Sequence, residues 1–245
     1  MFLFFREIFI ERRKNMYRRV LLKISGEALS SEESVICRKT VDSTAQKIKA
    51  VRAKGVQVGV VVGGGNILRG RSAEGMERNR ADHMGMLATA INSLALQDAL
   101  EQIGVPSVVQ SAVDMDRFCD PYSARSAKSA LEADKVVLFA CGSGCPFFST
   151  DTAAALRAAE IGADVLLLAK NIDAIYSADP KTDPAAVRYG RISYSRVVSE
   201  NLRATDLTAI TLCKEQKIPI RVFALDQIEK IFNDDSVGTL ISERE

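Results

Sequence analysis

The stretch Val58–Gly70, VGVVVGGGNILRG, constrains the fold of this chain more than any other. Its first five residues are apolar and, apart from Gly59, β-branched, which is typical of a buried strand. Three glycines follow, and they leave backbone N–H groups uncovered in a turn that leads towards a helix, where an anion is favoured. Arg69 adds a planar fork of donors suited to a phosphate. We therefore predict a phosphate-binding turn; a tight turn with a solvated arginine is the alternative interpretation.

The same alternation of strand and helix runs along the chain. Apolar, β-branched runs predict strands over residues 18–24, 56–62, 107–110, 135–140, 164–169, 218–223 and 238–241. Apolar residues at helical spacing predict helices over residues 40–54, 82–103, 122–133, 153–161, 205–217 and 226–232. Strands that alternate with helices form parallel sheets covered on both faces. The predicted fold is α/β: a three-layer α/β/α sandwich with a mainly parallel central sheet shared by both halves of the chain.

Three segments have a distinct character. Residues 70–80 are charged and contain glycine, which predicts a mobile loop, and residues 170–184 are rich in turn formers, which favours a hairpin. The predicted helix 82–103 is apolar on nearly every face, with Asp82 as a candidate N-cap. Such a helix lies either at the centre of a fold or at a subunit interface.

Composition argues against several classes of function. The net charge of +2 gives no reason to expect a nucleic-acid partner. Five cysteines are scattered without a C-x-x-C pair, and this odd number favours reduced thiols in a cytoplasmic protein. His83 is the only histidine, so any Ser-His-Asp or Cys-His mechanism would depend on that residue.

Residues 1–15 differ in character from the rest of the chain. The first ten, MFLFFREIFI, are aromatic and apolar but are interrupted by Arg6 and Glu7, are too short to span a bilayer, and lack the order of a signal peptide. We predict that residues 1–15 are a disordered N-terminal appendage and that residues 16–245 form a single domain. A short helix lying on a membrane surface is the alternative for the appendage, and no other membrane partner is expected.

Candidate functional residues gather where predicted strands end. In an open α/β sheet, ligands bind beyond the carboxyl ends of the strands. Polar, basic or glycine-rich sequence stands at four such ends, residues 23–26, 63–69, 142–151 and 170–179. Two glycine turns with a lysine between them predict phosphoryl transfer, which depends on positioning and charge neutralisation. The chain lacks G-x-x-x-x-G-K-[ST] and G-x-G-x-x-G, which argues against P-loop NTPases and, more weakly, against dinucleotide oxidoreductases.

Each candidate has a simpler interpretation when it is taken alone. Lys23 could be a solvated charge at a strand end, and Asp151 and Asp206 could be helix caps. The joint placement of these residues at strand ends is the stronger evidence for a site.

Four stretches together resemble the bacterial uridylate kinases of the amino-acid kinase superfamily. They are KISGEAL at 23–29, GGGN at 63–66 with Arg69 and Gly70, DHMGMLAT at 82–89, and PFFSTD at 146–151. The first two are shared across the superfamily, and the last two are more specific to the enzymes that act on UMP. The resemblance covers about residues 17–241 and implies an amino-acid-kinase-like fold. It also implies transfer of the γ-phosphoryl group of MgATP to UMP, giving UDP and ADP in pyrimidine nucleotide (CTP) biosynthesis.

The resemblance implies roles for individual residues. The ATP site would include Lys23, Ile24, Ser25, Gly26, Gly65, Arg69, Lys170, Asn171, Tyr176 and Asp179. The UMP site would include Gly64, Asp82, Ser143, Gly144, Cys145, Pro146, Phe147, Phe148, Ser149 and Thr150. The catalytic residues would be Lys23, Arg69, Asp151 and Asp206, with Asp151 organising Mg²⁺ indirectly and Asp206 orienting Lys23. The N-terminal half would then bind mainly UMP and the C-terminal half mainly ATP.

Two positions depart from the family pattern. The family commonly has Asn at the position of Cys145 and Thr-Lys at Lys170-Asn171. One polar contact to UMP would then be altered here, and one contact to ATP would be altered or shifted by one position. The resemblance further implies a homohexamer, with GTP as an activator and UTP as an inhibitor. Two alternatives remain open at this stage: a kinase of a carboxylate such as glutamate, aspartate or acetylglutamate, and a non-catalytic nucleotide sensor with the same fold.

Overall fold

The computed structural model describes residues 17–68, 75–202 and 205–243, so the predicted appendage at 1–15 and Arg69 lie outside the described residues. The helices are α2 (Arg38–Ala53), α3 (Arg78–Gln102), α4 (Ala124–Glu132), α5 (Thr150–Ile161), α6 (Tyr194–Ser199) and α7 (Leu207–Glu215). The strands are β1 (Arg19–Ile24), β2 (Gln57–Val62), β3 (Ser107–Ser111), β4 (Asp120–Pro121), β5 (Val136–Ala140), β6 (Val165–Lys170), β7 (Ile175–Tyr176), β8 (Arg188–Tyr189), β9 (Arg191–Ser193), β10 (Ile220–Ala224) and β11 (Thr239–Ser242). Short 3₁₀ turns are η1 (Gly26–Leu29), η3 (Leu225–Gln227) and η4 (Lys230–Phe232).

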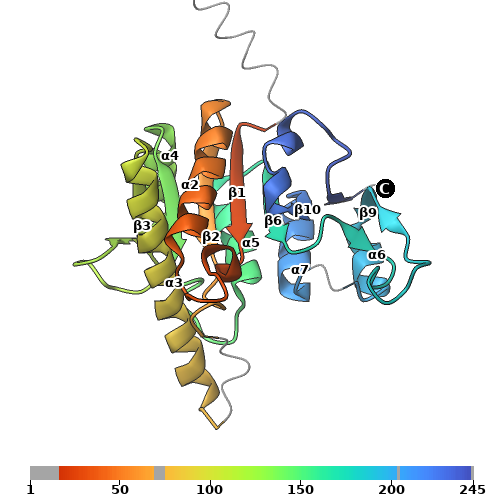
Figure 1. Cartoon of the computed structure of the whole chain (residues 1–245), viewed down its shortest axis with the longest axis horizontal. Helices are drawn as coiled ribbons and strands as arrows, with labels where there is room; N and C mark the ends of the chain where they lie inside the picture. Colours follow the sequence, from red (N-terminus) through yellow and green to blue (C-terminus); the bar gives the residue numbers. More distant parts are fainter. Residues whose placement is uncertain (1–16, 69–74, 203–204, 244–245) are drawn as a thin grey trace, which may run out of the picture.

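Nine of these strands form one sheet in the order β4-β3-β5-β2-β1-β6-β10-β11-β9 (Figure 1). Neighbouring strands pair in parallel except β10 with β11. Lys23, near the end of the central strand β1, is in register with Val61 of β2 and Leu168 of β6. The carboxyl ends of these strands therefore meet at one edge of the sheet. The predicted α/β sandwich with a mainly parallel sheet is confirmed.

Helices cover both faces of this sheet (Figure 1). Successive side chains of a strand point to opposite faces, so Leu22 of β1 packs in a core with α2 and α3, whereas Leu21 packs in a second core with α4, α5, α6 and α7. Both residues are fully buried. Burial on both faces explains why the strands are continuous apolar runs in the sequence.

Helix α3 begins at Arg78, four residues earlier than predicted, and Asp82 is not its N-cap. The N-cap is Glu77, whose carboxylate accepts hydrogen bonds from the backbone N–H groups of Asn79 at 3.0 Å and Arg80 at 3.1 Å. A glutamate side chain is long enough to reach back to these otherwise unpaired donors. Residues 78–80 are thus the first turn of α3 rather than a loop, and Asp82 lies within the helix.

Other differences from the prediction concern short elements. Strand β9 and the six-residue helix α6 were not predicted, because so few residues show no clear period. The predicted hairpin closes later, since β7 pairs with β8 at residues 188–189. Helix α5 begins at Thr150 instead of residue 153, and the helix predicted at 226–232 consists of the 3₁₀ turns η3 and η4.

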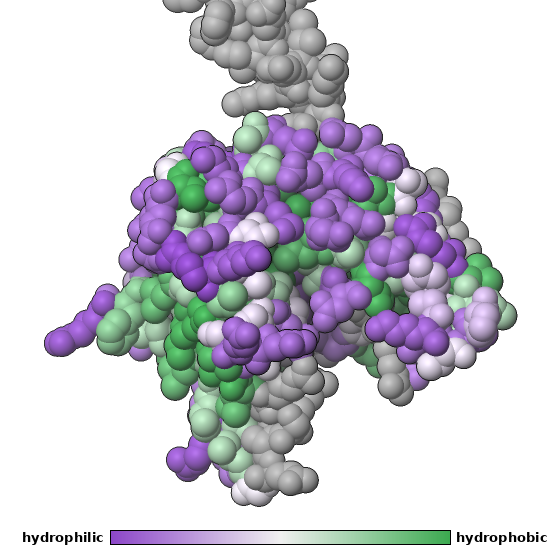
Figure 2. Space-filling view, viewed as in Figure 1, coloured by the Kyte–Doolittle hydropathy of each residue, from purple (hydrophilic) through white to green (hydrophobic). Residues whose placement is uncertain are grey.

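Helix α3 projects beyond the sandwich at the lower end of Figure 1. Met84, Leu87 and Ile91 are exposed on it, at spacings of three and four residues that place them on one face. Figure 2 shows a hydrophobic surface over the same lower-left part of the molecule. Within the described ranges, no helix is long and apolar enough to cross a membrane.

Candidate active site

The turns that follow β1 and β2 touch each other. The N–H of Gly63 donates to the carbonyl of Ile24 at 2.9 Å. A Cβ atom on Gly26 would lie 2.3 Å from Oδ1 of Asn66 and 2.6 Å from the carbonyl oxygen of Gly63. Only glycine allows this approach, because real Cβ atoms essentially never come within 3.0 Å of another heavy atom.

The glycine turn after β2 also packs against α3. A Cβ atom on Gly64 would lie 2.9 Å from both Cβ of Ala88 and the carbonyl oxygen of Gly85. None of the three glycines at 63–65 has a positive φ, so close packing rather than a left-handed backbone favours glycine at positions 63 and 64. No group in the described ranges accepts a hydrogen bond from the N–H of Gly64 or Gly65. Within the described residues, these two donors are available to an anion.

A buried amide holds this turn in place. Asn92 of α3 is fully buried, and its Nδ2 donates to the carbonyl of Gly63 and to Oδ1 of Asn66, both at 2.7 Å. Nδ2 of Asn66 in turn donates to the carbonyl of Val35 at 2.6 Å. Sequence reasoning missed Asn92, since one asparagine in an apolar helix carries no local signal.

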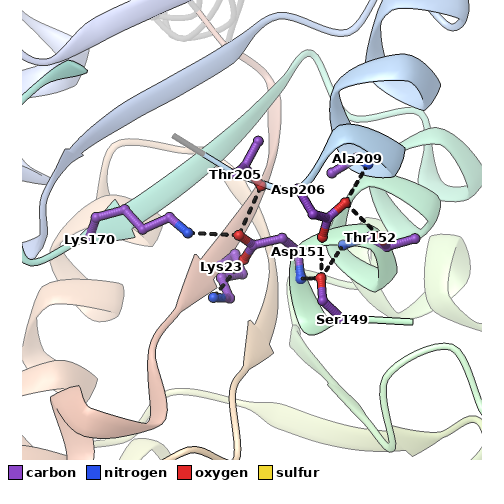
Figure 3. A network of polar contacts seen from close by, with 8 residues as sticks. All are labelled: Lys23, Ser149, Asp151, Thr152, Lys170, Thr205, Asp206 and Ala209. Atoms are coloured by element: carbon purple, nitrogen blue, oxygen red, sulfur yellow. Dashed lines mark hydrogen bonds and ion pairs between the residues drawn. The ribbon is translucent and has the colours of Figure 1, made fainter. Parts of the chain in front are cut away.

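Three charged side chains from separate elements meet beside these turns (Figure 3). Nζ of Lys23 on β1 lies 2.6 Å from Oδ1 of Asp151 in the first turn of α5. Nζ of Lys170, at the end of β6, lies 2.7 Å from Oδ2 of the same carboxylate. The hydroxyl of Thr205 donates to Oδ2 at 2.8 Å. One carboxylate is thus held between two ammonium groups.

Because Lys23 and Asp151 are buried, the pKa of each depends strongly on the charge of the other. Lys23 and Asp151 are 7% and 9% exposed. Burial lowers the pKa of the Lys23 ammonium, the charge of Asp151 partly offsets this effect, and the nearby Lys170 adds to it. Burial alone would raise the pKa of the Asp151 carboxyl, but the charges of Lys23 and Lys170 outweigh it and hold that pKa well below its usual range. Lys23, Asp151 and Lys170 together carry one net positive charge, and Asp206, which lines the same cavity as these residues, adds a further carboxylate.

Asp206 links the two helices that adjoin the cluster. Its carboxylate accepts hydrogen bonds from the N–H of Ala209 at 2.7 Å, from the hydroxyl of Thr152 at 2.8 Å and from the hydroxyl of Ser149. Asp206 is the N-cap of α7, and Ser149 is the N-cap of α5 (Figure 3). Its hydrogen bonds thus join the first turns of α5 and α7, whereas the direct ionic partner of Lys23 is Asp151.

Two cavities adjoin at this edge of the sheet, and Ser149 and Thr150 line both of them. The first is lined by Gly64, Gly65, Leu68, Arg78, Asp82, Gly85, Met86, Thr89, Cys141, Gly142, Ser143, Cys145, Phe148, Ser149 and Thr150. The second is lined by Lys23, Ser149, Thr150, Asp151, Lys170, Asn201, Leu202, Thr205, Asp206 and Leu207. Most residues predicted for UMP line the first cavity, and the two lysines line the second.

Several predicted residues lie elsewhere. Gly144, Pro146 and Phe147 do not line the first cavity among its described residues, and Ile24, Ser25, Gly26, Asn171, Tyr176 and Asp179 do not line the second. The hydroxyl of Tyr176 donates to Asp173 at 3.0 Å. The side chain of Asn171 approaches Glu27 at 3.4 Å, and Asp179 accepts from the N–H of Lys181 at 2.9 Å within a turn.

The cavities include residues that the sequence analysis did not assign. Met86 and Thr89 belong to the DHMGMLAT stretch, so their motif was a signal for them. Arg78 carried no such signal, because residues 70–80 were predicted as a loop. Thr205 precedes the assigned Asp206 and reaches the cluster only through the tertiary contact with Asp151.

The geometry does not fit Asp151 as a direct ligand of Mg²⁺. Each of its oxygens faces a lysine ammonium. Within the part of the chain that the structure describes, no group of three or more His, Cys, Asp or Glu side chains could hold a metal ion. A divalent ion would have to rely on ligands from outside this cluster.

Fold and site together define an α/β enzyme of phosphoryl transfer, with a lysine–carboxylate cluster beside two adjoining cavities. The chain belongs to the amino acid kinase family, whose model matches residues 18–224. Among solved structures it is similar to UMP kinase from Bacillus anthracis, with 34% identity, a TM-score of 0.90, and coverage of 94% of this chain and 97% of that one.

Two further structures are similar over most of their length. UMP kinase from Ureaplasma parvum shares 37% identity with a TM-score of 0.87, covering 92% of this chain and 99% of that one. Uridylate kinase from Archaeoglobus fulgidus shares 31% identity with a TM-score of 0.69, covering 91% of this chain and 99% of that one.

Proposed function

We propose that this protein is a UMP kinase, which transfers the γ-phosphoryl group of MgATP to UMP and forms UDP and ADP for pyrimidine nucleotide biosynthesis, including that of CTP. One observation carries the proposal: the cluster of Lys23, Asp151 and Lys170 lies beside two cavities that share Ser149 and Thr150. Phosphoryl transfer needs two neighbouring anion sites with cations at their junction. Similarity to UMP kinases over at least 91% of this chain supports UMP as the acceptor.

The proposed chemistry relies on charge and position rather than on a base. The phosphate of UMP is the nucleophile, and it is already ionised near neutral pH. Lys23 would stabilise negative charge on the transferred phosphoryl group, and Asp151 would hold Lys23 and Lys170 at a fixed separation. No general base is required, which suits a chain whose only histidine, His83, is exposed.

On the acceptor side, the unpaired N–H of Gly64 and the loop between β5 and α5 would hold UMP. Asp82 and the loop residues Ser143, Gly144, Cys145, Pro146, Phe147, Phe148, Ser149 and Thr150 complete the proposed site. The thiol of Cys145 is a weaker hydrogen-bonding group than the amide common in the family. We therefore expect binding of the base or phosphate of UMP to depend more on the residues next to Cys145.

On the donor side, the phosphates of ATP would lie along the turn after β1 and above the lysines. The residues we assign to ATP are Lys23, Ile24, Ser25, Gly26, Gly65, Arg69, Lys170, Asn171, Tyr176 and Asp179. Arg69 would reach the passing phosphoryl group. Mg²⁺ would arrive with ATP, and Asp151 would affect it only indirectly, through the lysines that it fixes.

We further propose self-association into a homohexamer through the exposed face of α3 that carries Met84, Leu87 and Ile91. An exposed apolar patch of this kind marks an interaction surface. Activation by GTP and inhibition by UTP would accompany that assembly. A cytoplasmic location is supported by five cysteines that are all free thiols.

An assay of ADP release with a panel of acceptors tests the proposed function. The panel contains UMP, CMP, glutamate, aspartate and acetylglutamate, each with MgATP. We expect turnover with UMP to exceed that with every other acceptor. Turnover with an acid but not with UMP would make the protein a carboxylate kinase, and UMP binding without any turnover would make it a nucleotide sensor.

A further inference from the structure

Helix α3 bonds to both ends of the loop formed by residues 141–149, which we call the acceptor loop. Oγ1 of Thr89 accepts a hydrogen bond from the N–H of Cys141 at 2.8 Å, and Oδ2 of Asp82 accepts one from the N–H of Phe147 at 2.8 Å. Thr89 and Asp82 are seven residues apart, which is two helical turns, so they lie on the same side of α3. The first cavity is lined by both.

The two loop residues held in this way share an unfavourable backbone conformation. Cys141 has a φ of 61° and Phe147 a φ of 72°, and they are the only non-glycine residues of the acceptor loop with positive φ. Side chains with a Cβ atom rarely adopt this region. Cys141 is fully buried, so its N–H would have no access to water if Thr89 did not accept from it. The helix thus supplies acceptors where the loop backbone is least stable.

The hydroxyl of Thr89 is oriented towards Cys141 by a second hydrogen bond. It is 3% exposed, and its hydroxyl proton is donated to the carbonyl of Met86 at 2.7 Å, which turns the oxygen lone pairs towards Cys141. Ser93, one turn further along α3, is also buried, but its hydroxyl bonds only to the carbonyl of Thr89 within the helix at 2.8 Å. The contact between Thr89 and Cys141 therefore differs from an ordinary hydroxyl bond inside a helix.

We propose that Thr89 is a positioning residue which, with Asp82, holds the acceptor loop in the conformation that receives the acceptor nucleotide. The inference rests on the proposed function, because that function makes the first cavity the acceptor site. Thr89 acts through the backbone of Cys141 and has no chemical role. Loss of the Thr89 hydroxyl should therefore weaken binding of the acceptor nucleotide and leave binding of ATP unchanged.

The test compares Thr89→Val, which removes the hydroxyl but keeps the shape, with Thr89→Ser, which keeps the hydroxyl. We expect Thr89→Val to raise the KM for UMP about tenfold and to leave the KM for ATP within about twofold. Thr89→Ser should stay within about threefold of the wild type for both substrates. Ser93→Ala is the matched control and should change neither KM. A general loss of structure would instead shift both KM values together, and that result would overturn the proposal.

A rescue variant examines the backbone argument directly. Glycine adopts positive φ without steric cost. The double variant Thr89→Val/Cys141→Gly should therefore have a KM for UMP at least about threefold lower than that of Thr89→Val alone. No restoration would contradict the proposed role of the strained backbone.

Hydrogen exchange separates this inference from the proposed function. Peptides covering residues 141–149 should exchange faster in Thr89→Val than in Ser93→Ala, while peptides from α2 stay unchanged. Equal exchange in both variants would overturn the inference even for an enzyme that phosphorylates UMP. Faster exchange of Thr89→Val that is confined to the acceptor loop would support the inference that Thr89 fixes the loop conformation. This outcome would hold even if the wild type did not turn over UMP.

Discussion

The cost of burying Lys23 explains the arrangement of the residues around it. An ammonium removed from water costs several kcal/mol unless an opposite charge compensates it. Asp151 supplies that charge but shares it with Lys170, so the pair of lysines is only half neutralised. The phosphates of a bound nucleotide would supply the remaining negative charge. On this proposal, substrate binding would itself complete the charge compensation of the cluster.

Replacing Lys23 by alanine should separate binding from chemistry. We expect UMP to bind within about threefold of its wild-type affinity, because Lys23 lines the second cavity and not the first. The turnover number should fall by about 10²–10³-fold, the usual effect of removing one group that stabilises transition-state charge. Titration calorimetry and steady-state kinetics measure the two quantities. Lys135→Ala, an exposed lysine at the opposite edge of the sheet, is the control; a Lys23→Ala enzyme with wild-type turnover would remove Lys23 from the mechanism.

Asp151→Asn should lower stability in a pH-dependent way. At pH 7 the two lysines would lose their partner, at a cost of about 3–5 kcal/mol in the free energy of unfolding. The folded-state pKa of Asp151 lies below its unfolded value, so its stabilisation is complete above about pH 4 and is lost as the pH falls further. The difference between wild type and variant should then shrink by up to about 1.4 kcal/mol per pH unit. Urea unfolding at several pH values measures it, and a difference that stays constant down to pH 3 would contradict the assigned ion pairs.

At the level of elements, α3 determines where the two walls of the first cavity lie. Its Asn92 holds the glycine turn, Gly64 packs against Gly85 and Ala88, and the acceptor loop is bonded through Thr89. Sequence analysis located the longer strands β1, β2, β3, β5, β6, β10 and β11, the glycine turn and the lysine, because each has a local pattern. It could not locate the first turn of α3, since Glu77 as a cap is outside the usual set. Nor could it find Asn92 or Thr205, whose roles depend on contacts between elements distant in sequence.

Gly64→Ala should test this packing. The new Cβ would lie 2.9 Å from atoms of Gly85 and Ala88, so either the turn or α3 must move. We expect a loss of about 1–3 kcal/mol in the free energy of unfolding, typical of overpacking, together with a raised KM for UMP. Gly190→Ala is the matched control, because a Cβ there would meet nothing within 4 Å. Equal stability of the two variants would show that the turn does not need the close approach.

At the level of the whole molecule, Asp164 binds the backbone at the amino end of the central strand β1. The carboxylate of Asp164 accepts from the N–H groups of Arg18 at 2.6 Å and Arg19 at 2.8 Å. Strand β1 then continues between β2 and β6, and all three strands are apolar runs in the sequence. The predicted sandwich was therefore recoverable from sequence, whereas the short strands β4 and β9 depended on pairing with neighbours.

A chain that starts at Met16 should keep full activity and remain soluble. The described residues pair β1 with β2 and β6 and bind its amino end to Asp164, so we expect the sheet and both cavities to form when residues 1–15 are removed. Circular dichroism, thermal unfolding and the kinase assay compare the two forms. A loss of activity or solubility would show that residues 1–15 belong to the fold.

Phosphorus NMR of one reaction mixture tests the central claim most directly. The mixture contains the protein, MgATP and UMP, and the signals of ATP, ADP, UDP and inorganic phosphate are followed with time. The account predicts that UDP and ADP form in equal amounts without inorganic phosphate, and that Lys23→Ala slows both by the same factor. Release of inorganic phosphate in place of UDP, or consumption of ATP only when a carboxylic acid replaces UMP, would contradict it.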